Sequence, residues 1–183
     1  MPIRSDNYEK LSLELKSIDI NKVKDLSNIM YLREYNASKS ENKLAKSIHE
    51  GLNGLLGIKP TDDFWSPVDL IIYHNKLNIK FYVELKDRHI EDKYETLMIG
   101  RSKVCLINHR ELYPTYVVNQ FKNKTYVYVI DSEDFLISYK RDDKNMYIPK
   151  SVCFSFEKFI ELLQQKYLIA YNHHQLNSNT IIP

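Results

Sequence analysis

The chain has 183 residues, of which 43% are apolar and 27% charged, a balance typical of a folded globular domain and not of a disordered chain. Its 26 lysines and arginines against 24 aspartates and glutamates leave a net charge of +2, so overall charge alone gives no argument for nucleic-acid binding. No apolar run is long enough to cross a bilayer, so we expect no membrane insertion.

The first part of the chain contains two predicted helices. Residues 1–18 are polar and irregular, and we expect them to form a flexible end. Apolar residues at helical spacing predict a short amphipathic helix over 20–32. A second helix is predicted over 38–57, where Ser38 and Glu41 have the spacing of a capping box.

The next segment is predicted to form a β-hairpin. The polar stretch 58–67 reads as a connection with a short strand at its start. Residues 68–74 and 79–86 are rich in Ile, Val, Tyr and Phe, and three of the four residues between them are polar. This pattern predicts two antiparallel strands joined by a tight turn.

The remainder of the chain is predicted to add a helix, three strands and a final helix. The first helix covers 101–112. The strands are β-branched and aromatic runs separated by polar turns, over 114–121, 124–131 and 134–140. The final helix covers 155–171, and residues 172–183 are expected to be a loose tail. No linker or repeat divides residues 1–183, so a single α/β domain is predicted.

Cysteine usage and composition bear on the compartment. Cys105 and Cys153 lie in apolar stretches without CxxC spacing, which predicts buried thiols in a reducing compartment. The first residues lack the features of a signal peptide. We therefore expect an intracellular protein, in the cytoplasm or nucleus of a host if it is virus-encoded. Abundant Asn, Lys, Ile and Tyr with only 4 glycines is a usage seen in many AT-rich viral coding sequences.

The predicted hairpin carries three charged residues within strands suited to burial. Residues two apart in a strand point to the same face, so Glu84 and Lys86 share one face while Val83 and Leu85 occupy the other. A hairpin centred on the polar turn places Asp69 opposite Glu84. Cross-strand partners bring their β-carbons within roughly 5 Å, so two carboxylates are expected to converge.

Two converging carboxylates indicate a cation site. Like charges this close repel each other unless a cation lies between them, and oxygen ligands favour a hard ion such as Mg²⁺ or Mn²⁺. Lys86 beside that ion could orient or help deprotonate an attacking water, or stabilise charge on a phosphoryl oxygen. Together these groups suit metal-assisted hydrolysis of a phosphodiester.

Simpler interpretations compete with this one. The Glu-Leu-Lys triplet alone could be a surface ion pair, and Glu41 could serve only to cap its helix. Glu50, on the same helix, is an alternative to Glu41 as a site residue. Asp62 and Asp63 precede an aromatic residue in a loop, where such a pair usually forms a turn.

The segment SPVDLIIYHNKLNIKFYVELK, between a helix that carries Glu41 and a helix followed by strands, resembles the PD-(D/E)XK nuclease superfamily. The resemblance spans about residues 38–130. It implies the αβββαβ core of restriction-endonuclease-like folds, a central mixed sheet flanked by helices, here with extra C-terminal strands and a helix. It also implies a nuclease that depends on Mg²⁺ or Mn²⁺.

The resemblance assigns roles residue by residue. Asp69, Glu84 and Lys86 match the aspartate, acid and lysine of the motif, and Glu41 matches the glutamate of the first helix in many members. The backbone carbonyl of Leu85 is implied as a metal ligand beside Asp69 and Glu84. The literal proline-aspartate pair is absent, because one valine separates the two residues.

The region after the motif resembles small phage and viral members, in which a basic residue on the following helix often faces the site. Lys103 is the first candidate and Arg101 the second. With Arg88 and Lys93 they form a local run of positive charge suited to phosphate groups. We expect a DNA endonuclease, and a homodimer is a candidate assembly. Alternatives are a junction resolvase, an RNA-directed nuclease, a non-catalytic nucleic-acid-binding protein, or an interaction module that binds no metal.

Overall fold

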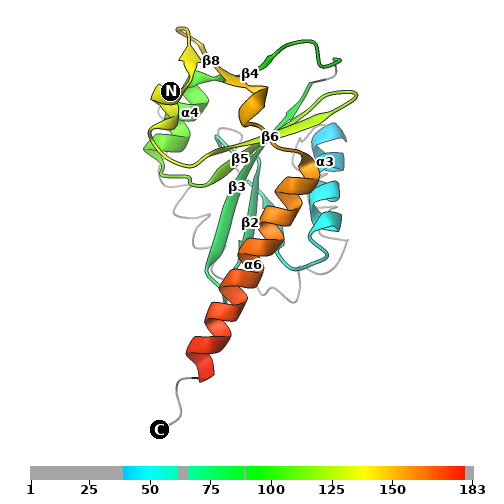
Figure 1. The fold of residues 1–183 in the computed structure, drawn as a ribbon, viewed down its shortest axis with the longest axis vertical. Coiled ribbons are helices and arrows are strands. Elements are labelled where there is room, and N and C mark those ends of the chain that lie inside the picture. Colours follow the sequence, from blue (N-terminus) through cyan, green and yellow to red (C-terminus); the bar gives the residue numbers. More distant parts are fainter. Residues whose placement is uncertain (1–38, 62–65, 89, 180–183) are drawn as a thin grey trace.

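The computed structural model describes residues 39–61, 66–88 and 90–179, and Figure 1 shows their arrangement. Their helices are α3 (Lys39–Gly51), α4 (Arg101–His109), α5 (Phe135–Ser138) and α6 (Phe156–Asn179), with a single 3-10 turn at Lys150–Val152. The flexible end predicted over 1–18 and the helix predicted over 20–32 lie outside these residues. Within them, no helix has the length and hydropathy needed to cross a membrane.

A five-stranded mixed sheet forms the centre of the fold. Its strands, in spatial order, are β1 (Gly57–Pro60), β2 (Leu70–His74), β3 (Ile79–Asp87), β5 (Thr115–Gln120) and β6 (Thr125–Ile130). The β3 and β5 strands are parallel, and the other neighbours are antiparallel. The order α3, β1, β2, β3, α4, β5 confirms the expected αβββαβ core, with one additional strand inserted before α4.

That inserted strand belongs to a second, smaller sheet. Its members, in spatial order, are β4 (Thr96–Gly100), β8 (Asn145–Pro149) and β7 (Lys140–Arg141). Figure 1 shows α4, β4 and β8 grouped together, apart from α3 and α6. The central sheet therefore separates two cores, one beneath α3 and α6 and one beneath α4, α5 and the small sheet.

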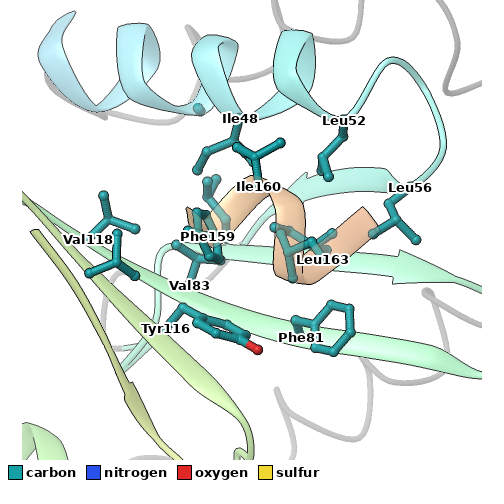
Figure 2. Close-up of a cluster of buried hydrophobic side chains, with 14 of the residues drawn as sticks. Ile48, Leu52, Leu56, Phe81, Val83, Tyr116, Val118, Phe159, Ile160 and Leu163 are labelled. Carbon is teal, nitrogen blue, oxygen red and sulfur yellow. The ribbon is translucent and has the colours of Figure 1, made fainter. Parts of the chain in front are cut away.

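The core beneath α3 and α6 is apolar. Figure 2 shows Ile48 and Leu52 facing Phe159 and Leu163, with Val83 of β3 among them. All five side chains are 0% exposed. The odd-numbered residues of β3 from Ile79 to Leu85 face this core, so its even-numbered residues face the other side of the sheet.

The hairpin has the predicted register. Leu70 pairs with Val83, and the ladder runs without a bulge to the pair His74 and Ile79 at the turn. Asp69 lies just before β2, where its N–H donates to the Val83 carbonyl at 2.8 Å. The pairing of the two strands therefore extends to Asp69, next to Glu84.

Some predicted elements differ from the structure. The strand expected over 134–140 is instead α5 followed by β7, because a single helical turn lets Phe135 stack on Tyr128 with ring centroids 6.0 Å apart. The tail expected from residue 172 is helical to Asn179, since no Gly or Pro interrupts α6.

The burial expected for the two cysteines is also wrong in part. Cys105 is exposed on the outer side of α4, and Cys153 is half-buried, with its thiol donating to the Pro149 carbonyl at 3.6 Å. Neither forms a disulfide.

Replacing Phe159 by alanine should lower the free energy of unfolding by about 3–5 kcal/mol, because the ring is fully buried between α6 and the sheet. Leu168→Ala is the matched control on the same helix, and its 53% exposed side chain predicts a change below about 0.5 kcal/mol. Urea denaturation of both variants provides the comparison. Equal losses would mean that α6 does not pack on the sheet through Phe159.

Candidate active site

A buried acid lies at the centre of the candidate site. Glu84 is 0% exposed, on a strand whose neighbouring residues Val83 and Leu85 enter the apolar core beneath α3 and α6. Its side chain faces the opposite side of the sheet, beneath α4. An isolated ionised carboxylate is costly to bury, so its partners decide whether this position is tolerated.

Two lysine side chains contact the same oxygen of Glu84. Lys86, two residues along β3, and Lys103, on α4, both form ion pairs with Oε1. Their side chains are 32% and 27% exposed, so each ammonium connects the buried carboxylate to the surface. The structure thus brings the first-ranked basic residue of the helix, Lys103, to the predicted acid.

Asp69 completes the group from the start of β2. Its Oδ2 accepts a hydrogen bond from the Leu85 backbone N–H at 2.6 Å, which fixes the carboxylate at the edge of the β2–β3 pair. Its charge is close enough to Glu84 to raise the pKa of that residue. The meeting of the two carboxylates expected from the hairpin register is therefore present.

Opposing influences set the protonation of Glu84 and Lys86. Burial, and then the Asp69 charge, raise the pKa of Glu84 from 4.5 to about 7, although Lys103 and Lys86 act in the other direction. Burial acts to lower the pKa of Lys86, but the Glu84 and Asp69 charges outweigh it and the pKa is raised. Lys86 is therefore a stable cation at neutral pH.

The donor set of this group fits a hard divalent cation. Glu84 Oε2 is buried and has no hydrogen-bond partner among the described residues, and it lies near a second carboxylate. In the same part of the chain, no group of three or more His, Cys, Asp or Glu side chains is placed to hold a metal ion. Two carboxylates suffice for Mg²⁺, which usually keeps several waters and uses one or two protein carboxylates plus substrate phosphates.

Glu50, the alternative acid of the first helix, does not join the group. Glu50 is 58% exposed and pairs with Lys46 at 3.6 Å on the surface of α3. The side chain of Glu41, although its backbone is in α3, lies outside the described residues, as do Asp62 and Asp63. The site as described therefore consists of residues from β2, β3 and α4.

The remaining basic residues lie around the end of β3 and the start of α4. Arg88 Nη2 donates to the Met98 carbonyl at 2.5 Å and to Asn119 Oδ1 at 3.4 Å, so this nitrogen forms hydrogen bonds within the protein. Arg101 begins α4 and is half-buried, and Lys93 is exposed in the connection between β3 and β4. Arg88 thus links the two sheets, a structural role that the sequence did not indicate.

Two buried polar residues beside the site were missed by the sequence analysis. Asn119 is 0% exposed and pairs with Lys86 in the β3–β5 register, and Tyr128 is 2% exposed on β6. An asparagine within a β-branched run, in TYVVNQF, was the available signal, because Asn is depleted in strands.

Comparisons with known proteins give only distant likenesses. No protein-family model and no curated protein matches the sequence. Among solved structures, Hjc, a Holliday junction resolvase from Archaeoglobus fulgidus, is similar with a TM-score of 0.44 and 13% identity, over 66% of this chain and 92% of that one. A bacterial homing endonuclease gives a TM-score of 0.40 and 15% identity, over 75% of this chain and 98% of the endonuclease chain. Because both likenesses are weak, the function of the site is inferred from its own side chains.

The raised pKa of Glu84 predicts a pH-dependent stability of the metal-free protein. The folded protein holds this proton up to about pH 7, whereas the usual value is 4.5, so the contribution of Glu84 to the free energy of unfolding falls as pH rises between the two. The difference in unfolding free energy between wild type and Glu84→Gln should fall by up to about 3 kcal/mol across this window.

Urea unfolding of both proteins at intervals from pH 4 to 8, with a chelator present, measures this difference. In wild type the raised pKa of Lys86 keeps its ammonium charged over the whole window, so Lys86 adds no slope there. A difference that stays constant or rises with pH would show that the Glu84 carboxylate is not destabilised by its burial.

Proposed function

We propose that the protein is a divalent-metal-dependent nuclease that hydrolyses phosphodiester bonds in DNA. The observation that carries this proposal is the convergence of Asp69, Glu84 and two lysine ammonium groups beneath α4. One buried oxygen of Glu84 has no partner in the part of the chain that the structure describes. Carboxylates for a cation and ammonium groups for phosphate oxygens are the groups that phosphodiester hydrolysis requires.

Asp69 and Glu84 would hold Mg²⁺ or Mn²⁺, with the Leu85 carbonyl as a further candidate ligand. Such an ion lowers the pKa of bound water and polarises a phosphate. The protein prepares these ligands in advance, since the Leu85 N–H fixes Asp69 and the strand itself fixes Glu84. Little reorganisation is then needed when the ion and substrate bind.

Lys86 is assigned an electrostatic role. Its raised pKa keeps the ammonium protonated at neutral pH, so in this state it can donate hydrogen bonds and cannot accept a proton. Its side chain is partly exposed, so the ammonium is suited to stabilise charge that develops on a phosphoryl oxygen, or to orient the attacking water. Lys103, which contacts the same carboxylate from α4, adds a second positive charge at the same point.

The choice of a nucleic acid as substrate rests on the basic residues in the segments next to the site. Arg101 lies two positions before Lys103 at the start of α4, and Lys93 is exposed in the connection that follows β3. Positive side chains in these two segments are suited to contact the phosphates of a strand. RNA and branched DNA present the same phosphates, and the test below includes them.

Alanine or amide substitution at the site should abolish metal-dependent cleavage. We expect Asp69→Asn, Glu84→Gln and Lys86→Ala each to reduce the cleavage rate more than about 100-fold, because each removes a ligand or charge aimed at the reacting phosphate. Lys103→Ala should cost less, about 10-fold, since Lys86 still contacts Glu84. Gel assays with supercoiled, linear, single-stranded and four-way-junction DNA and with RNA, in Mg²⁺, Mn²⁺ or EDTA, measure these rates.

Lys158→Ala is the matched control for the lysine variants. Lys158 pairs with Glu161 at 3.0 Å on the exposed side of α6, where a surface ion pair contributes little, so its activity should equal that of wild type. Cleavage that persists in EDTA, or that survives in Glu84→Gln, would contradict the metal-dependent mechanism. Binding of nucleic acid without cleavage under any condition would favour the non-catalytic alternative.

A further inference from the structure

Three buried polar groups on one face of the central sheet have no hydrogen-bond partner among the described residues. They are Glu84 Oε2 on β3, Asn119 Nδ2 on β5 and Tyr128 Oη on β6. A buried polar group that lacks a hydrogen bond costs about 1–3 kcal/mol, so unpaired groups of this kind are rare in folded proteins. Three of them in one place call for a common explanation.

The strand registers place these groups side by side. Glu84 pairs with Val117 on β5, and Val117 pairs with Tyr128 on β6, so Glu84 and Tyr128 flank the same small apolar side chain. Asn119 lies one row further along, opposite Lys86. Because paired residues share a face, all of these side chains lie beneath α4 and the small sheet.

Electrostatic coupling supports this proximity. Burial raises the pKa of the Tyr128 hydroxyl, and the Cys153 thiol and the Glu84 carboxylate raise it further, while the Arg88 charge and the hydrogen-bonding influence of the Asn119 side chain act in the opposite direction. Both Glu84 and Asn119 are therefore close enough to Tyr128 to influence its hydroxyl.

The three groups are also chemically complementary. Asn119 donates from Nδ2, because its Oδ1 already accepts from Arg88 at 3.4 Å. Tyr128 can donate its hydroxyl proton, and Glu84 Oε2 can only accept when ionised. One water that accepts from both donors and donates to Glu84 would satisfy all three.

We propose that Asn119 and Tyr128 are positioning residues that hold the Glu84 carboxylate in its orientation from behind the site. Arg88 extends this support by fixing the Asn119 amide and linking it to β4 through the Met98 carbonyl. Donors that act on a metal-binding carboxylate from the outer shell typically change metal affinity 10- to 100-fold. The link to metal rests on the function proposed above, whereas the support of Glu84 does not.

A double-mutant cycle in the metal-free protein tests the support directly. At pH 8 with EDTA, Tyr128→Phe should lower the thermal unfolding midpoint by about 3 °C, and by less than about 1 °C when Glu84→Gln is also present. The difference arises because a hydrogen bond to a carboxylate is stronger than one to an amide. Asn119→Leu should follow the same pattern.

Tyr116→Phe is the matched control. Tyr116 is 4% exposed on β5, one residue before Val117, and it points into the opposite core, against Phe159 with ring centroids 5.0 Å apart. Figure 2 shows it on that face, so its effect should be the same in both backgrounds. If Tyr128→Phe also shifts the midpoint equally in both backgrounds, or raises it, the hydroxyl is an isolated buried group and the inference is wrong.

Calorimetric titration with Mn²⁺ separates this inference from the proposed function. We expect Tyr128→Phe to weaken Mn²⁺ binding about 10-fold relative to wild type, with Tyr116→Phe unchanged. No binding to wild type would overturn the metal-dependent function, and the thermal cycle would still decide the role of Tyr128. Coupling in the cycle with equal Mn²⁺ affinity in Tyr128→Phe would confine the role of the network to the stability of Glu84.

Discussion

The burial of one ionisable acid governs the organisation of this molecule. Glu84 lies within a central strand, away from bulk water, so groups held by the fold must stabilise its charge. Of the compensating cations, Lys86 comes from the same strand and Lys103 from α4. Asp69, from the start of β2, instead adds a second negative charge. Each of the three residues depends on a different part of the fold. Lys86 depends on the alternation of side chains along β3, Lys103 on the packing of α4, and Asp69 on the register of the hairpin.

The compensation is incomplete, and this has functional meaning. Two ammonium groups contact one oxygen of Glu84, yet burial and Asp69 still raise its pKa to about 7. A leucine at this position would extend the apolar core without any such cost. Buried charges that the protein compensates only in part are expected at functional sites, because a bound ligand completes the compensation there. A divalent cation between two carboxylates relieves both the repulsion and the unpaired oxygen.

Local pattern was sufficient to predict the hairpin and its charged face. Alternation in β3 separates Glu84 from Val83, and the short polar turn fixes the register that brings Asp69 beside it. Segments with weaker signals were misjudged. The β4 and β8 strands were not predicted, and they pair with each other across more than 40 residues of chain, which no short turn signals. The α5 helix forms because Phe135 stacks on Tyr128, a contact that propensity does not encode.

The residues behind the site could not be found by the same reasoning. Asn119 and Tyr128 are far from Glu84 in sequence, and their proximity depends on the parallel pairing of β3 with β5, which is made only after the chain passes through β4 and α4. Parallel pairing has no short turn that would set its register. An asparagine in an apolar strand signals a special position, but it does not identify its neighbours.

The division of the sheet into two unlike faces makes the site possible. The face beneath α3 and α6 is apolar, so it can stabilise the sheet without any contribution from Glu84. On the other face, Val104 and Ile107 of α4 are 0% exposed and fix the rotation of that helix. Lys103 is adjacent to Val104, so this apolar packing determines where its ammonium meets Glu84. The charge balance of the site is therefore set by hydrophobic contacts that involve no charged group, and a change in the packing of α4 alters the electrostatics at Glu84 without replacing any residue of the site.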